Sequence, residues 1–243
     1  MTTLLMLTLM TTDPPAAASD DSATGTQSVE RFDGTTSAAF DYLLSLPEGY
    51  ASSEESVPLV VFLHGAGERG EDVSAVAKHG PPKLVRAGRE FPFILVSPQC
   101  RPGRWWQPTE VLALIDHVQA THRVDADRIY LTGLSMGGFG AWETAGLEPD
   151  RFAAIAPVCG GGTPMIIRNL TGVPVWAFHG DADPVVPAKS SQRLVDAVNE
   201  RGGNAKLTLY KGVGHDSWTQ TYDDPQFWDW LLSQRRSPSR RSP

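Results

Sequence analysis

The first residue in this chain that could do chemistry is a serine set between glycines. Ser135 lies in Gly133-Leu134-Ser135-Met136-Gly137, after a short apolar run and before a helical pattern. A serine on a tight strand-to-helix turn has strained backbone angles, and glycines on both sides let the neighbouring backbone pass without collision. The turn would expose the hydroxyl beside the free N–H groups of a helix N-terminus, which favour a developing oxyanion. We predict that Ser135 is a nucleophile; the alternative is a glycine-serine turn without chemistry.

An acid and a base follow later strands. Asp181 and Asp183 come after the apolar run 173–178, and His215 comes after the run 206–210. A serine hydroxyl needs a base to take its proton, and an imidazole serves if a carboxylate orients it. Because Ser135, the acid and His215 each leave the end of a different strand, they can converge. The residue pattern leaves either aspartate as the acid.

The same polar residues suggest a rival chemistry. Histidine and carboxylate ligands suit several divalent metals, so a two-metal hydrolase could be built from Asp181, Asp183, His64, His179 and His215. That reading leaves the glycine-flanked serine unexplained. We therefore expect no metal and no organic cofactor.

The elements that must position these residues alternate along the chain. Alternating apolar residues over 40–46 predict a half-buried strand, with 29–32 as its antiparallel neighbour. Buried strands are predicted at 58–63, 93–98, 128–134, 152–158, 173–178 and 206–210. Helices are expected over 72–78, broken at 79–82, then from about Thr109 as a candidate cap, and over 188–200 and 225–234. The alternation predicts an α/β fold with a doubly wound, mostly parallel sheet flanked by helices.

In combination, these motifs resemble the α/β-hydrolase superfamily, and more narrowly its dienelactone hydrolase, prolyl oligopeptidase-like and carboxylesterase branch. The resemblance rests on His64-Gly65-Ala66-Gly67, the Ser135 motif, His179-Gly180-Asp181-Ala182-Asp183 and Gly214-His215, and it covers about 40–234. It implies that Asp183 is the acid, from the family spacing after His-Gly. It also implies that the backbone N–H groups of Met136 and Ala66 form the oxyanion hole.

The shape of the predicted site is open. Only fourteen residues, Cys159 to Gly172, separate two of the strands, where lipase-like relatives often insert a helical lid, so we expect no large lid. Trp105, Trp106 and Trp218 could wall a substrate pocket, although each could equally pack in the core. Gln99, with Glu68 and Arg69, could contact polar substrate groups.

Length and composition indicate one domain. The chain has 243 residues, is 41% hydrophobic and carries a net charge of −7, which argues against a nucleic-acid-binding surface. We divide it into a leader or signal-like segment with a linker (1–28), the α/β-hydrolase domain (29–234) and a basic disordered tail (235–243). The apolar start is too short to span a membrane and has no basic residue before it, so export and a cytoplasmic location both stay open. We expect Cys100 and Cys159 to be thiols, a single disulfide being the alternative.

The function predicted from these features is a serine hydrolase that cleaves carboxylic esters, of the carboxylesterase, feruloyl esterase or acetyl esterase kind. Its substrate would be a small-molecule or saccharide-linked ester. A peptidase of the prolyl oligopeptidase type would use the same residues, and a binding module that has lost catalysis is the alternative from another class. The fold also supports lyase and perhydrolase chemistry. The sequence leaves the oligomeric state open.

Overall fold

One eight-stranded sheet organises the structure, which is a computed structural model that describes residues 26–33, 39–167, 169–237 and 240. The strand order is β1-β2-β4-β3-β5-β6-β7-β8. The first two strands pair antiparallel with each other and β2 pairs antiparallel with β4, while all pairs from β4 to β8 are parallel. The predicted α/β class and the mostly parallel sheet are confirmed. The strands are β1 (Gln27–Asp33), β2 (Ala39–Ser45), β3 (Val57–Leu63), β4 (Ile94–Pro98), β5 (Val124–Leu134), β6 (Ala154–Val158), β7 (Val175–Gly180) and β8 (Ala205–Tyr210).

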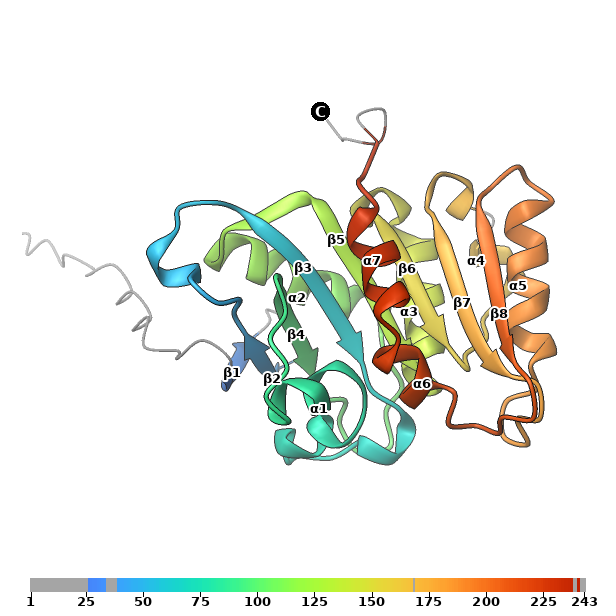
Figure 1. Ribbon diagram of the computed structural model, residues 1–243, viewed down its shortest axis with the longest axis horizontal. Coiled ribbons are helices and arrows are strands. Elements are labelled where there is room, and N and C mark those ends of the chain that lie inside the picture. The colour runs from blue at the N-terminus through green and yellow to red at the C-terminus, as the bar shows by residue number, and fades with distance from the viewer. Residues whose placement is uncertain (1–25, 34–38, 168, 238–239, 241–243) are drawn as a thin grey trace, which may run out of the picture.

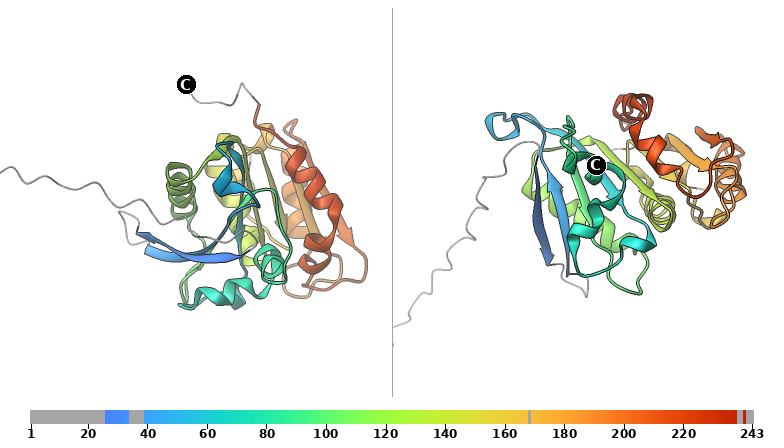
Figure 2. Two further views of the ribbon diagram at one scale, coloured as in Figure 1. Left: turned by 60° about the vertical axis from the view of Figure 1, so that its left-hand side comes forward. Right: turned by 60° about the horizontal axis from the view of Figure 1, so that its bottom comes forward.

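Helices cover both faces of the sheet. Figure 1 shows α1, α6 and α7 in front of it and α2, α3 and α5 behind it, and Figure 2 shows α7 and α2 on opposite sides. Alternate residues of β3 feed the two resulting cores, because Val61 lies in one apolar cluster and Val60 and Phe62 lie in the other. The helices are α1 (Gly80–Arg86), α2 (Pro108–Thr121), α3 (Met136–Leu147), α4 (Pro164–Ile167), α5 (Lys189–Asn199), α6 (Trp218–Asp223) and α7 (Pro225–Ser233).

Two predicted helix boundaries are wrong, and proline explains both. The run at 79–82 does not break the chain but begins α1, with prolines in the first turn, where the missing N–H has no helical partner. Helix α2 starts at Pro108 after Gln107, so Thr109 lies inside the helix rather than capping it. The segment 73–78 is 3₁₀-helical, and α6 was not predicted. The predicted helix at 225–234 is confirmed as α7, and the Asp224 carboxylate caps it by accepting the Gln226 N–H at 2.9 Å.

Parts of the predicted ends lie outside the described residues. Positions 1–25 of the leader are among these, and β1 already begins at Gln27. The described tail arginines contact the domain rather than solvent alone: Arg235 pairs with Asp125 at 3.1 Å, and Arg236 pairs with Asp127 at 3.3 Å. Among the residues that the structure describes, no helix has the length and apolar character needed to cross a membrane.

Candidate active site

The turn from β5 into α3 holds Ser135 in a strained conformation. Its φ is 52° and its ψ is −116°, a region that side-chain-bearing residues seldom occupy. A Cβ atom on Gly137 would lie 1.9 Å from the Leu63 carbonyl oxygen, and one on Gly133 would lie 2.5 Å from the Gly137 oxygen. Only glycine therefore fits on both sides of the serine. The tight turn leaves Ser135 partly exposed between buried neighbours.

The structure brings Ser135, His215 and Asp183 into one hydrogen-bonded chain. The Nε2 atom of His215 lies 2.9 Å from Ser135 Oγ, and its Nδ1 atom lies 2.7 Å from Asp183 Oδ2. Because a carboxylate only accepts, it favours the tautomer with the proton on Nδ1, which leaves Nε2 free to take the serine proton. The arrangement is therefore able to generate a serine nucleophile.

Of the two candidate aspartates, Asp183 is the one hydrogen-bonded to His215. Burial opposes its ionisation, but hydrogen bonds from His215 and from the N–H groups of Val186 and Val185 hold the pKa of this carboxyl below its usual value. Asp181 is exposed and accepts the Gly212 N–H at 2.6 Å, so it closes a turn instead. The geometry thus separates the two candidates that the residue pattern left open.

His215 reaches Ser135 because two loops cross closely. A Cβ atom on Gly180, at the end of β7, would lie 2.2 Å from the Val213 carbonyl oxygen. Glycine at position 180 therefore lets the loop after β8 pass directly over the end of β7. Trp218 then stands edge-on to the His215 ring, with centroids 5.4 Å apart.

Two backbone N–H groups are available near the serine. Met136 is the first residue of α3, and Ala66 is the first residue of the 3₁₀ turn Ala66–Glu68 that follows β3. In the described part of the chain, neither N–H donates a hydrogen bond. Unpaired N–H groups at helix starts suit a developing negative charge.

Comparison with known proteins agrees with this geometry. The family model for the dienelactone hydrolase family matches residues 106–226, which include Ser135, Asp183 and His215. A crystal structure of a thermostable esterase superposes with a TM-score of 0.75 and 33% identity, over 86% of this chain and 63% of that one. The chain belongs to the α/β-hydrolase superfamily.

Two curated proteins are similar in sequence to part of this α/β hydrolase. NocK of Nocardia uniformis subsp. tsuyamanensis, named as an esterase, is 31% identical over 157 residues, or 60% of this chain and 46% of NocK. A protein of Aspergillus terreus, named as a feruloyl esterase C, is 26% identical over 189 residues, or 74% of this chain and 66% of that one. The chain thus spans about half of the first and about two thirds of the second.

The other histidines considered for a metal cluster brace the α/β-hydrolase scaffold. His64 is buried, and its Nε2 accepts the Cys100 N–H at 2.9 Å while Nδ1–H donates to the Gly65 carbonyl at 2.6 Å. Burial, with a smaller effect of the Arg69 charge, lowers the pKa of His64 to about 4. His179 is also buried, and its Nε2 lies 2.9 Å from the Val186 carbonyl oxygen. Burial lowers its pKa as well.

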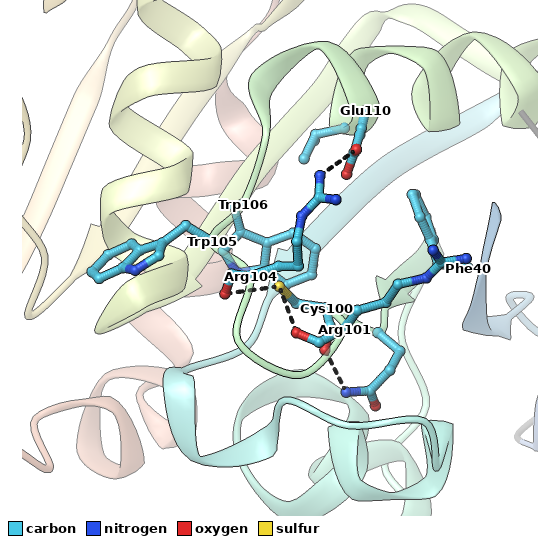
Figure 3. Close-up of a pocket in the computed structure, with 9 residues that line it drawn as sticks. Phe40, Cys100, Arg101, Arg104, Trp105, Trp106 and Glu110 are labelled. Atoms are coloured by element: carbon cyan, nitrogen blue, oxygen red, sulfur yellow. Dashed lines mark hydrogen bonds and ion pairs between the residues drawn. The ribbon is translucent and has the colours of Figure 1, made fainter. Parts of the chain in front are cut away.

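The predicted pocket residues divide into exposed and buried ones. Trp105 is 56% exposed, meets the Phe139 ring edge-on at 6.0 Å and lines the small cavity shown in Figure 3. Trp106 forms the inner wall of that cavity, and its Nε1–H donates to the His64 carbonyl at 3.0 Å. Trp218 is partly buried beside His215. Contact of Trp105 and Trp218 with substrate stays a prediction.

Gln99 and Glu68 are hydrogen-bonded to the loop that follows β3. Gln99 is buried and donates from Nε2 to the Glu68 carbonyl at 2.6 Å and the Cys100 carbonyl at 3.1 Å. Glu68 is 5% exposed, and its Oε2 accepts the Gly65 N–H at 3.1 Å. The three-residue spacing from Gly65 to Glu68 is that of a capping box, a signal in the sequence that predicts this bond. These contacts hold the loop, and contact of either side chain with substrate stays a prediction.

Both cysteines are free and buried, as expected. Burial raises the pKa of Cys159 to about 12 and that of Cys100 to about 11, so both are thiols at neutral pH. The Sγ atom of Cys159 accepts the Ser135 N–H at 3.3 Å. Cys159 itself has a φ of 40°, so two strained residues meet at the serine turn.

Proposed function

We propose that this α/β hydrolase cleaves carboxylic esters through a serine, histidine and aspartate triad. The observation that carries the proposal is the continuous hydrogen-bonded chain from Ser135 Oγ through both ring nitrogens of His215 to the buried Asp183. The esterase names of the relatives support an ester over other acyl compounds. The short 3₁₀ and helical segments between β6 and β7 leave the site without a large lid.

The geometry supports a two-step reaction. His215 Nε2 takes the proton of Ser135 as Oγ attacks the ester carbonyl carbon, and the N–H groups of Met136 and Ala66 stabilise the resulting oxyanion. The imidazolium, stabilised by the ionised Asp183, then gives that proton to the departing alcohol oxygen as the C–O bond breaks. Water, deprotonated by the same nitrogen, next attacks the acyl-enzyme and releases the acid.

We further propose that the acyl group is an acetyl or a feruloyl group. The name of the Aspergillus relative supports the aromatic acid, and the exposed Trp105 offers a planar apolar surface at the edge of the site. The site lies open at the strand ends, which suits an ester whose alcohol is part of a saccharide.

The test compares p-nitrophenyl acetate, p-nitrophenyl butyrate and methyl ferulate as substrates of the wild type and of Ser135→Ala. We expect the variant to lose activity by roughly 10⁴–10⁶-fold, as triads do when the nucleophile is removed. Ser233→Ala, which changes an exposed serine on α7, is the matched control and is expected to keep full activity. Folding of each protein is checked by circular dichroism.

Two outcomes would contradict the proposal in different ways. Activity that survives in Ser135→Ala would remove Ser135 as the nucleophile. A wild type that reacts with a fluorophosphonate at Ser135 but cleaves none of the esters, while cleaving a peptide p-nitroanilide, would keep the triad and replace the esterase by a peptidase.

A further inference from the structure

Glu68 is a buried carboxylate that the reaction above does not use. Among the residues that the structure describes, only Glu68 and Asp183 are carboxylates with buried side chains. Removing a carboxylate from water is costly unless protein groups replace the lost hydration. Asp183 has a role as the acid of the proposed triad. The contacts of Glu68 indicate what its burial does for the same site.

The contacts of Glu68 close the turn that carries Ala66. Its Oε2 accepts the Gly65 N–H at 3.1 Å, while its own N–H points back to the Gly65 carbonyl at 3.4 Å. Its main-chain carbonyl is held by Gln99 at 2.6 Å. The residue therefore fixes the start and the end of one short turn, with Ala66 between them.

The Ala66 peptide is held from the other side as well. Its carbonyl accepts a hydrogen bond from Arg69 Nε at 3.0 Å, and the same guanidinium donates to the Arg104 carbonyl at 3.2 Å. With the preceding Gly65 N–H bound to Glu68, the Ala66 N–H is the next donor along the chain and stays unpaired among the described residues. The turn thus offers this N–H to a ligand.

The second carboxylate oxygen of Glu68 is linked to His215 through the rings of His79 and Trp218. Oε1 lies 3.7 Å from His79 Nε2, the His79 ring lies 5.4 Å from the Trp218 ring, and Trp218 in turn packs against His215. The contacts link the turn after β3 to the loop after β8.

We propose that Glu68 is a positioning residue, whose bond to the Gly65 N–H sets the turn so that the Ala66 N–H faces the reacting carbonyl oxygen. The inference rests on the proposed ester hydrolysis. It assigns the effect to the geometry of an acceptor atom and not to the charge of the carboxylate. A misplacement of about 1 Å at a catalytic group is enough to cost about 10²-fold in rate.

Three substitutions separate geometry from charge. Glu68→Gln keeps an acceptor oxygen at the same distance without the charge and is expected to retain a kcat near that of the wild type. Glu68→Asp keeps the charge but is one methylene shorter, and Glu68→Ala has no acceptor; both are expected to lower kcat by about 10–100-fold with little change in KM. Glu71→Ala, which changes an exposed acid three residues on, is the matched control.

A second measurement follows the oxyanion site directly. Phenylboronic acid forms a tetrahedral adduct with a catalytic serine, and the adduct carries an oxygen where the oxyanion would lie. Its inhibition constant on p-nitrophenyl acetate hydrolysis should rise in parallel with the loss of kcat in Glu68→Asp and Glu68→Ala, and stay unchanged in Glu68→Gln. If Glu68→Ala does not fold, the comparison of Glu68→Gln with Glu68→Asp still separates the effect of geometry from that of charge.

Three results would overturn the inference. A Glu68→Gln variant as impaired as Glu68→Asp would assign the effect to the charge, and a rise in KM at constant kcat would assign it to substrate contact. Wild-type kinetics in Glu68→Ala would show that the turn needs no such bond. Each of these leaves the proposed function standing as long as Ser135→Ala is inactive, whereas activity in Ser135→Ala would overturn the function itself.

Discussion

The two halves of the active site are held in place by different means. The triad half consists of Ser135, Asp183 and His215 with the turns that carry them, at the ends of β5, β7 and β8. The oxyanion half consists of the loops 64–70 and 99–106, which follow β3 and β4. In the triad half close backbone contacts determine the geometry, whereas in the oxyanion half buried side chains determine it.

In the triad half, neighbouring backbone segments lie too close together to admit a side chain at two glycines. A Cβ atom would lie 1.9 Å from backbone at Gly137 and 2.2 Å from backbone at Gly180. The acid is held by two main-chain N–H groups, those of Val185 and Val186, at 2.8 and 3.0 Å. These contacts need particular backbone shapes, and glycine in the sequence marks where they occur.

Side-chain hydrogen bonds across long sequence distances hold the oxyanion half. His64 binds the Cys100 N–H, and Trp106 binds the His64 carbonyl. Gln99 and Glu68 complete the bracing through the main chain of the turn after β3. This half depends on polar groups whose partners lie in another loop, so its stability should respond to side-chain deletion and to pH.

The largest expected effect tests the triad half at its acid. Asp183→Asn should lower kcat on p-nitrophenyl acetate by about 10⁴-fold, because an amide in place of the carboxylate favours the wrong imidazole tautomer. The same change at Asp181 keeps an acceptor oxygen for the Gly212 N–H and should leave kcat close to that of the wild type. Steady-state kinetics of both variants would contradict the assignment if Asp181→Asn were the damaged one.

The two tryptophans of the oxyanion half should differ in stability. Trp106→Ala removes a buried indole and the donor to the His64 carbonyl, and should lower the free energy of unfolding by about 3–5 kcal/mol. Trp105→Ala removes an exposed ring and should change it by less than about 0.5 kcal/mol. Urea denaturation measures both, and equal losses would show that this loop is not held through its buried side.

Alanine at Gly137 in the triad half should cost far more stability than alanine at Gly67 in the oxyanion half. The methyl group of Gly137→Ala would collide with the Leu63 carbonyl, and moving backbone to accommodate it should cost about 3 kcal/mol of unfolding free energy. Gly67→Ala places its methyl group in open space and should leave stability within about 0.5 kcal/mol of the wild type. An equally tolerant Gly137 in thermal and urea unfolding would refute the backbone argument.

The last expected effect, which develops only at low pH, is a pH dependence of stability that comes from His64. Its pKa is about 4 in the folded protein against an ordinary 6.5, so between these values the unfolded chain binds the proton and the folded protein does not. The stability that His64 contributes is therefore complete above pH 6.5 and is lost as the pH falls toward 4, by about 3 kcal/mol in total. The test measures the unfolding free energy of the wild type and of His64→Gln at pH 7 and at pH 4. The difference between the two proteins should shrink at pH 4, because other titrating groups affect both proteins alike. A difference that does not change with pH would contradict the low pKa.

The sequence predicted the triad half better than the oxyanion half. The Ser135 turn, the positions of the strands along the chain and the place of His215 after the last strand were predicted from glycine spacing and from continuous apolar runs, which are local features. Gln99 and Trp106 were expected to line the substrate pocket, and the sequence did not predict their hydrogen bonds to the loop after β3, about 30 and 40 residues earlier in the chain. No local pattern reports a partner at that distance, and a polar or aromatic side chain in a loop looks the same whether it is buried or exposed.

The sequence by itself predicted the fold class, a candidate nucleophile and the end of the sheet at which the site would form. It could do so because the spacing of apolar residues, the continuous apolar runs and the glycines each restrict the conformation of the backbone within a short stretch of the chain. The tertiary structure alone decided that Asp181 closes a turn, that Glu68 faces inward, and that His64 is neutral at neutral pH. Those properties depend on burial and on atoms brought together from distant strands, and burial is created only when the strands and helices pack.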